Sequence, residues 1–169
     1  MTRGHKGIQK IWELEAPIIV PIQGWAIGGS FQRALMCDIR IASEKARFAE
    51  SFAKLGIISG DGGAFLLPKL VGMSKAAEMT FTGDMIGADE ALECGLVSRV
   101  VPHDSLMDEA HILEGKIAAN PGHSLRMSKK LLREGVHSRL ETVLDMAAAF
   151  QALAHHTPEH DDAVNALIK

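Results

Sequence analysis

Residues 17–38 read PIIVPIQGWAIGGSFQRALMCD, and this stretch carries the strongest indication of the fold. The β-branched run over residues 18–22 predicts a buried strand, whereas the two prolines that frame it favour an edge position or a strand end. Residues 30–36 predict a short helix directly after Gly28 and Gly29. The order of strand, glycine pair and helix therefore indicates a tight turn at the start of a helix.

The glycine pair matters for chemistry because it lies at a helix start. Backbone N–H groups in the first turn of a helix have no intrahelical partner and carry a partial positive charge. Glycine lets a ligand approach that backbone closely. The turn therefore predicts a cradle for a phosphate or a developing oxyanion, and a tight strand-to-helix turn without a ligand is the alternative.

Short strands and helices alternate along the first part of the chain, and the C-terminal third is helical. Residues 56–63 contain four glycines and predict a loop, while residues 48–55 indicate no single structure. The other expected elements are strands over 38–42 and 96–101, helices over 7–14, 75–82 (with Ser74 as N-cap) and 88–93, and helices of apolar periodicity from Leu106 onward.

The composition is that of an ordinary globular protein. Hydrophobic residues make up 47% and charged residues 23% of the 169 residues, and the net charge is −3. This balance gives no reason to expect a nucleic-acid or membrane-surface partner. The longest strongly apolar stretch, residues 16–22, is far shorter than the ~20 residues that span a bilayer. Cys37 and Cys94 are too few for a disulfide framework and indicate a reducing, cytosolic setting.

Histidines near the C-terminus form a weak candidate for a metal site. His156 and His160 are four residues apart, with Asp161 and Asp162 next to them. Pro158 lies between the two histidines and disrupts a shared helical face. A solvated helix start is therefore the favoured interpretation, and no metal is expected.

Two carboxylates flank the glycine-rich loop, and each is a candidate for acid–base chemistry. Asp61 stands between glycines, where its side chain can reach a cleft; the alternative is a turn aspartate that bonds its own backbone. Glu50 precedes the loop, and its alternative is a surface position on an alternating strand. Acid–base chemistry needs a carboxylate within hydrogen-bond reach of the substrate, and sequence spacing leaves these alternatives open.

A series of short motifs runs from residue 17 to residue 101. They are Pro17-Ile18-Ile19, Gly24-Trp25-Ala26-Ile27-Gly28-Gly29, Met36-Cys37-Asp38-Ile39, Ala46-Arg47-Phe48, Leu55-Gly56, Gly60-Asp61-Gly62-Gly63, Leu70-Val71-Gly72, Thr82-Gly83 and Gly95-Leu96-Val97. Together these motifs resemble the enoyl-CoA hydratase/isomerase family, also called the crotonase superfamily. The helices over residues 104–168 resemble its C-terminal trimerisation region.

The resemblance implies an α/β fold with the crotonase-like β-β-α spiral over residues 1–101 and a helical trimerisation region over residues 102–169. It implies a coenzyme A thioester as substrate, no separate cofactor, and assembly as a trimer or a hexamer. Chains of the family are longer at the N-terminus, so the resemblance implies a shortened member whose first strands are missing. That part carries one of the family's two oxyanion donors and much of its CoA pocket.

The resemblance also assigns residues to the site. It carries the other oxyanion donor onto Gly29 and makes Ala26, Gly28 and Phe52 substrate-binding residues, with Phe52 lining an apolar acyl pocket. Hydratases of the family place two catalytic glutamates at positions that are Gln32 and Phe52 in this sequence. A neutral amide cannot act as a general base, and a phenyl ring cannot titrate. Efficient hydration is therefore disfavoured.

The remaining acidic residues then carry the chemistry. Asp61, helped by Glu50, is the expected acid–base residue, and the expected protein is a cytoplasmic enzyme of fatty acid metabolism. It stabilises a thioester enolate and isomerises a double bond, or performs a related proton transfer. A non-catalytic acyl-CoA-binding or assembly protein on the same fold is the alternative. A homo-oligomer is expected, because a spiral without its first strands exposes sheet edges and apolar faces.

Overall fold

The structure, a computed structural model, describes residues 3–168, which divide into two compact units. The first unit contains residues 3–14 and 18–114, and the second contains residues 15–17 and 115–168. The division into a spiral over residues 1–101 and a helical region over residues 102–169, which the family resemblance implies, stays a prediction. The two units are described separately.

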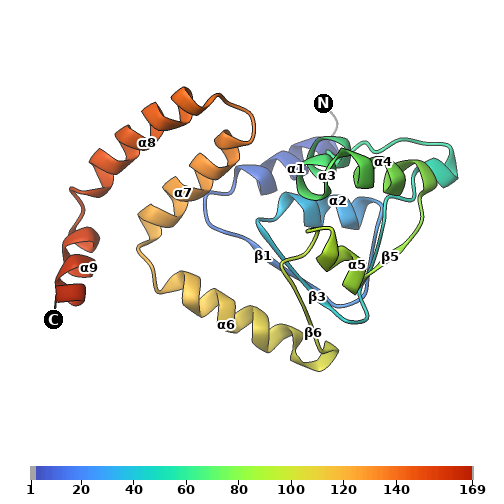
Figure 1. Cartoon of the computed structure of the whole chain (residues 1–169), viewed down its shortest axis with the longest axis horizontal. Coiled ribbons are helices and arrows are strands. Elements are labelled where there is room, and N and C mark those ends of the chain that lie inside the picture. Colours follow the sequence, from blue (N-terminus) through green and yellow to red (C-terminus); the bar gives the residue numbers. More distant parts are fainter. Residues whose placement is uncertain (1–2, 169) are drawn as a thin grey trace. The chain divides into compact units, whose positions relative to one another are not determined.

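Two three-stranded sheets form the frame of the first unit (Figure 1). One sheet has the order β1–β3–β6 and is parallel throughout, whereas the other has the order β2–β4–β5, with β4 and β5 antiparallel. The strands are β1 (Ile19–Ile22), β2 (Trp25–Ile27), β3 (Ile39–Ser43), β4 (Arg47–Ala49), β5 (Ile86–Gly87) and β6 (Arg99–Val101). The predicted proline-containing strand is thus β1, and it does lie at a sheet edge. An edge strand tolerates Pro21, which has no backbone N–H to donate to a neighbouring strand.

Two successive β-β-α repeats explain the parallel pairing. In the first repeat, β1 and β2 precede helix α2 (Gly29–Met36), and in the second, β3 and β4 precede helix α3 (Gly63–Val71). Each repeat gives its first strand to one sheet and its second strand to the other. Ile19 therefore pairs with Ile39 in one sheet, and Trp25 pairs with Arg47 in the other. This winding has the β-β-α order that the family resemblance implies.

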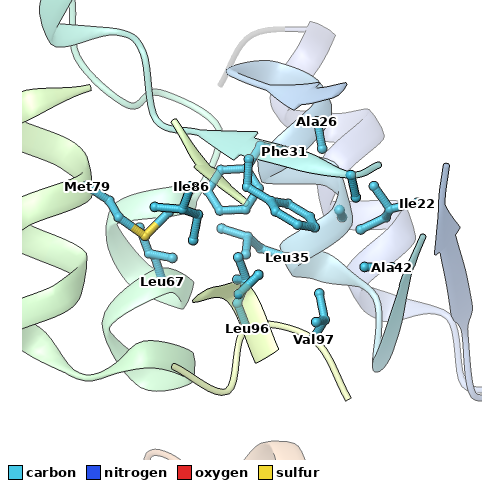
Figure 2. Packing of buried hydrophobic residues seen from close by; sticks show 14 of the residues in the cluster. Ile22, Ala26, Phe31, Leu35, Ala42, Leu67, Met79, Ile86, Leu96 and Val97 are labelled. Atoms are coloured by element: carbon cyan, nitrogen blue, oxygen red, sulfur yellow. The ribbon is translucent and has the colours of Figure 1, made fainter. Parts of the chain in front are cut away.

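Helix α2 is the central packing element of the first unit. Five of its eight residues are buried, and Figure 2 shows Phe31 and Leu35 among residues from several other elements. The Phe31 ring lies 6.0 Å, centroid to centroid, from the ring of Phe48 on β4. Burial of this kind fixes helices through apolar area, at about 25 cal/mol per Å². The position of the glycine turn at the start of α2 is therefore set by the core.

The remaining elements of the first unit differ from the predictions in two places. Helix α4 (Met73–Thr82) follows Gly72, so the prediction of Ser74 as its N-cap is wrong: Gly72 has φ +79° and turns the chain directly from α3 into α4. The strand expected over residues 96–101 is shorter, because the N–H groups of Leu96 and Val97 donate to Ala91 O and close the end of α5 (Ala88–Glu93).

The predicted helix near the N-terminus is α1 (Arg3–Glu13), and residues 53–55 form a short 3-10 turn, η1 (Ala53–Leu55). A second 3-10 turn, η2 (His103–Ser105), leads into α6 (Leu106–Ala118), which continues across the division between the units. Among residues 3–168, no helix is both long and apolar enough to cross a membrane.

The second unit consists of helices. After the end of α6 come α7 (Gly122–Gly135), α8 (Leu140–Ala154) and α9 (Pro158–Ile168). Lys129 of α7 is buried and donates a hydrogen bond of 2.7 Å to Ala16 O, which ties residues 15–17 to this unit. The helical C-terminal third of the sequence prediction is thereby confirmed.

Candidate active site

The glycine turn between β2 and α2 presents the backbone N–H group of Gly29. Gly28 adopts φ +57°, a conformation that glycine accepts without strain, and its N–H donates to Ala49 O at 3.0 Å. The Ile27 N–H donates to Ser30 Oγ at 2.9 Å. Among residues 3–168, no acceptor meets the Gly29 N–H. This N–H lies at the positive end of α2, so the turn can polarise a carbonyl oxygen.

The Asp61 carboxylate lies beside the same turn. A methyl group built on Gly29 would lie 3.8 Å from Asp61 Oδ2. The loop over residues 56–62 brings Asp61 there, and its side chain is half-buried. The structure therefore brings the predicted acid–base residue and the predicted oxyanion donor together.

Gln32 is the centre of a buried polar network behind this pair. Its side chain is 0% exposed, and its Oε1 accepts a hydrogen bond of 2.9 Å from the Asp61 N–H. Its Nε2 lies 3.2 Å from each carboxylate oxygen of Glu50 and also makes a short contact with Ser59 Oγ. One amide thus links α2, the end of β4 and the glycine-rich loop.

Glu50 is buried, not exposed, so its alternative as a surface residue is wrong. Only 1% of the residue is exposed, and burial raises the pKa of its carboxyl above the ordinary value, while the Gln32 amide opposes this rise. A methyl group on Gly63 would lie only 2.3 Å from Glu50 Oε1. The carboxylate therefore occupies the space beside the first residue of α3, where the partial positive charge of a helix start favours an anion.

The predicted substrate-binding residues lie in different surroundings. Phe52 is half-buried, and its Cζ lies 3.5 Å from the position of a methyl group on Gly28, so its ring covers the glycine turn. Ala26 is buried in the core, although it also borders a second pocket of about 400 Å³ beside β1 and β2. Contacts of Ala26, Gly28 and Phe52 with a substrate stay predictions.

An open pocket of about 260 Å³ has Asp61 in its wall. Its walls come from α1, the end of α2, the glycine-rich loop and α3, and most of its lining is apolar. The lining residues are Ile8, Gln9, Trp12, Met36, Gly60, Asp61, Gly62, Phe65 and Leu66. An apolar pocket with one carboxylate in its wall suits a ligand that has a hydrocarbon tail.

The histidines near the C-terminus do not form the pair that the sequence suggested. His160 Nε2 lies 3.1 Å from Nδ1 of His155, not from His156. Within residues 3–168, no three His, Cys, Asp or Glu side chains are grouped so that they could hold a metal ion.

Sequence reasoning missed the roles of Gln32 and Ser59. The sequence presents Gln32 only as a replacement for a glutamate, and Ser59 only as part of an unassigned loop. A signal for both exists, because a buried helix face that carries a glutamine needs polar partners from another segment. The sequence contains no indication of which segment supplies them.

The chain is similar to proteins of one family over almost its whole length. Residues 2–168 match the family described as Enoyl-CoA hydratase/isomerase. A short-chain-enoyl-CoA hydratase of Clostridium acetobutylicum is 37% identical over 166 residues, which are 98% of this chain and 64% of that protein. A 1,2-epoxyphenylacetyl-CoA isomerase of Escherichia coli is 31% identical over 161 residues, which are 95% of this chain and 62% of that protein.

A solved structure is similar in fold. The crystal structure of an enoyl-CoA hydratase from Bacillus anthracis matches with a TM-score of 0.95 at 35% identity, over 97% of this chain and 64% of that chain. The resemblance drawn from the short motifs is thereby confirmed, and so is the α/β fold of these hydratases. The chain spans a little less than two thirds of the length of these relatives.

Proposed function

The chain belongs to the enoyl-CoA hydratase/isomerase family, and from this premise we propose that it moves a proton on an unsaturated acyl-CoA thioester. The reaction is the shift of a double bond, or a related proton transfer through an enolate. One observation carries this proposal: Asp61 Oδ2 lies 3.8 Å from the position of a methyl group on Gly29, the first residue of α2.

The proposed reaction uses two groups of the chain. The Gly29 N–H donates a hydrogen bond to the thioester carbonyl oxygen, and the Asp61 carboxylate removes a proton from C2 of a 3-enoyl thioester. The electron pair moves onto the carbonyl oxygen and forms a dienolate. The protonated Asp61 then gives its proton to C4, and a C2–C3 double bond results. The step consumes neither water nor an oxidant.

Hydration has weaker support from the same residues. The two positions that carry glutamates in hydratases hold Gln32 and Phe52 in this chain. The Gln32 amide is engaged with Asp61, Glu50 and Ser59, and the ring of Phe52 covers Gly28. Neither side chain can take a proton from water. Isomerisation needs one carboxylate, and Asp61 supplies it.

The acyl tail is proposed to enter the apolar pocket beside Asp61. Trp12, Met36 and Phe65 are among the residues that line it, and the pocket volume is about 260 Å³. Burial of a hydrocarbon tail there contributes about 0.8 kcal/mol per methylene group. The coenzyme A moiety is part of the substrate, and no separate cofactor or metal enters the proposed reaction.

Assembly and location are also parts of the proposal. We expect a homo-oligomer, a trimer or a hexamer, because α8 has no buried residue although it carries many apolar side chains. A reducing compartment such as the cytoplasm suits Cys37 and Cys94, which are not joined in a disulfide bond.

The test combines titration calorimetry with mass spectrometry of the products. The whole chain is titrated with 3-octenoyl-CoA and, separately, with 2-octenoyl-CoA. We expect saturable binding of both, and interconversion of the two esters without a change of mass. Asp61→Asn should bind both esters and convert neither, since an amide cannot carry the proton.

Two outcomes contradict the proposed reaction. Gain of the mass of one water by 2-octenoyl-CoA would assign the chain to hydration. Binding without any conversion would favour the non-catalytic acyl-CoA-binding or assembly protein, for which the glutamine and phenylalanine at the glutamate positions are the supporting observation.

A further inference from the structure

Gln32 holds the backbone of Asp61 from a position that no solvent reaches. Its Oε1 accepts the hydrogen bond of the Asp61 N–H at 2.9 Å, and the residue is 0% exposed. Asp61 stands between Gly60 and Gly62, two residues with wide conformational freedom. The bond to Gln32 fixes the position of the Asp61 N–H within this segment.

Glu50 decides which end of the Gln32 amide faces Asp61. Both carboxylate oxygens of Glu50 lie 3.2 Å from Gln32 Nε2, and an ionised carboxylate only accepts hydrogen bonds. The NH₂ end must therefore face Glu50, which leaves Oε1 for the Asp61 N–H. The opposite orientation would place the Gln32 amide oxygen against the Glu50 carboxylate. It would also place the Gln32 NH₂ group against the Asp61 N–H, so that two donors would face each other.

The first turn of α3 leaves no space for this arrangement to change. A methyl group on Gly63 would lie 2.7 Å from Gln32 Nε2 and 2.3 Å from Glu50 Oε1. The amide and the carboxylate thus fit tightly against the helix start. Their rotamers are fixed by packing as well as by hydrogen bonds.

We propose that Gln32 is a positioning residue, which together with Glu50 holds the Asp61 carboxylate beside the Gly29 N–H. This inference rests on the proposed function, in which Asp61 transfers the proton. The residue at a position where hydratases carry a catalytic glutamate has then become the support of a different acid–base residue. Glu50 acts through Gln32, because both of its oxygens face the amide.

The test uses one variant that removes the hydrogen bonds of Gln32 and one double variant that swaps the amide and the carboxylate. Gln32→Met keeps the length of the side chain but removes both hydrogen-bonding ends. The double variant Gln32→Glu/Glu50→Gln exchanges the two groups, so that the carboxylate now at position 32 accepts from the Asp61 N–H and from the amide now at position 50. The Ser59 hydroxyl can rotate and donate instead of accepting. Gln151→Met, at an exposed position of α8, is the matched control for the chemical change.

The first measurement is hydrogen exchange of the Asp61 amide, followed by NMR on the whole chain. We expect slow exchange in the wild type and in Gln151→Met. Hydrogen exchange of this amide should be about tenfold faster in Gln32→Met, as the loss of one hydrogen bond predicts. It should be slow again in the double variant Gln32→Glu/Glu50→Gln. Unchanged protection in Gln32→Met would overturn the inference. If Gln32→Met does not fold, fast hydrogen exchange of the Asp61 amide in Gln32→Glu/Glu50→Gln would overturn the inference.

The second measurement separates this inference from the proposed function. With 3-octenoyl-CoA, Gln32→Met should lose about 10²-fold in kcat with little change in KM, the size of effect that a misplacement of about 1 Å has in other enzymes. The double variant Gln32→Glu/Glu50→Gln should regain kcat. Loss of turnover in Asp61→Asn with wild-type kcat in Gln32→Met overturns only the positioning role. Wild-type turnover in Asp61→Asn overturns the proposed function.

Discussion

At the scale of single residues, the burial of Glu50 links stability to pH. Burial raises its pKa above the ordinary value of 4.5. The folded state therefore binds more protons than the unfolded state at pH values above 4.5 and up to the raised pKa. The free energy of unfolding should fall as the pH rises through this window.

Glu50→Gln should remove that contribution, since a neutral amide does not titrate. The measurement is urea denaturation at a series of pH values across the window. We expect a flatter dependence in Glu50→Gln, whereas Glu93→Gln, an exposed residue of α5, should keep the wild-type slope. A wild-type slope in Glu50→Gln would show that another group causes the pH dependence.

Gly63 is required by close packing. A methyl group there would come within 2.3 Å of Glu50 Oε1 and 2.7 Å of Ser59 Oγ, so the network has to move. Gly63→Ala should lower the free energy of unfolding by about 1–3 kcal/mol, the usual cost of overpacking, and it should reduce turnover. Gly115→Ala is the matched control, because its methyl group would meet no atom within 4 Å. Equal stability of Gly63→Ala and the wild type would contradict the packing shown by the structure.

At the scale of elements, Arg40 connects β3 with two other segments. Its Nε donates to Leu96 O at 2.6 Å and its Nη1 to Cys37 O at 2.7 Å, and burial lowers its pKa. Only a guanidinium reaches both carbonyls at once with fixed geometry. Arg40→Lys should therefore lower the free energy of unfolding by about 1–3 kcal/mol, because a buried carbonyl loses its donor.

Thermal and urea denaturation would test the role of Arg40. Arg33→Lys, at an exposed position of α2, should leave the midpoint unchanged. Destabilisation of equal size in both variants would mean that the two carbonyl bonds of Arg40 contribute nothing specific.

Local patterns predicted the elements well where one segment determines its own structure. Helix α2 and helix α5 lie where the glycines and apolar residues placed them, and Pro21 indicated the edge strand. The errors concern helix ends and strand pairing. β5 has only two residues and exists because it pairs with β4, and β6 starts late because Leu96 and Val97 close α5 instead.

The site shows the same division between local and long-range information. The start of α2 and the candidate acid Asp61 could be predicted, because glycines mark both. The link between them could not be predicted, because it joins Gln32, Glu50 and Ser59 across 18 and 27 positions of the sequence. Burial of Glu50 likewise depends on the packing of α3 and is not visible in its neighbours along the chain.

At the scale of the whole molecule, the helices of the second unit predict self-association. Leu140, Leu144 and Leu153 of α8 are 69%, 57% and 60% exposed, and no residue of this helix is buried. An exposed apolar surface of this kind is typical of an interaction site. Sedimentation of the 18.2-kDa chain should give the mass of a trimer or a hexamer.

Leu144→Glu should weaken this association, because it places a charge in the apolar surface of α8. Gln151→Glu introduces a charge on the same helix and is the matched control. A monodisperse wild-type monomer at the highest soluble concentration would contradict the expected assembly. Equal dissociation in both variants would show that net charge, not the apolar surface, controls it.

The central claim is that Asp61 transfers a proton to and from C2 of an acyl-CoA whose carbonyl oxygen is held by Gly29. The most direct measurement is exchange of the C2 protons of octanoyl-CoA in D₂O, followed by NMR, because it needs neither a double bond nor water addition. We predict that the wild-type chain introduces deuterium at C2, and that Asp61→Asn binds the same ester without exchange. Equal rates of exchange in the two proteins would contradict the claim.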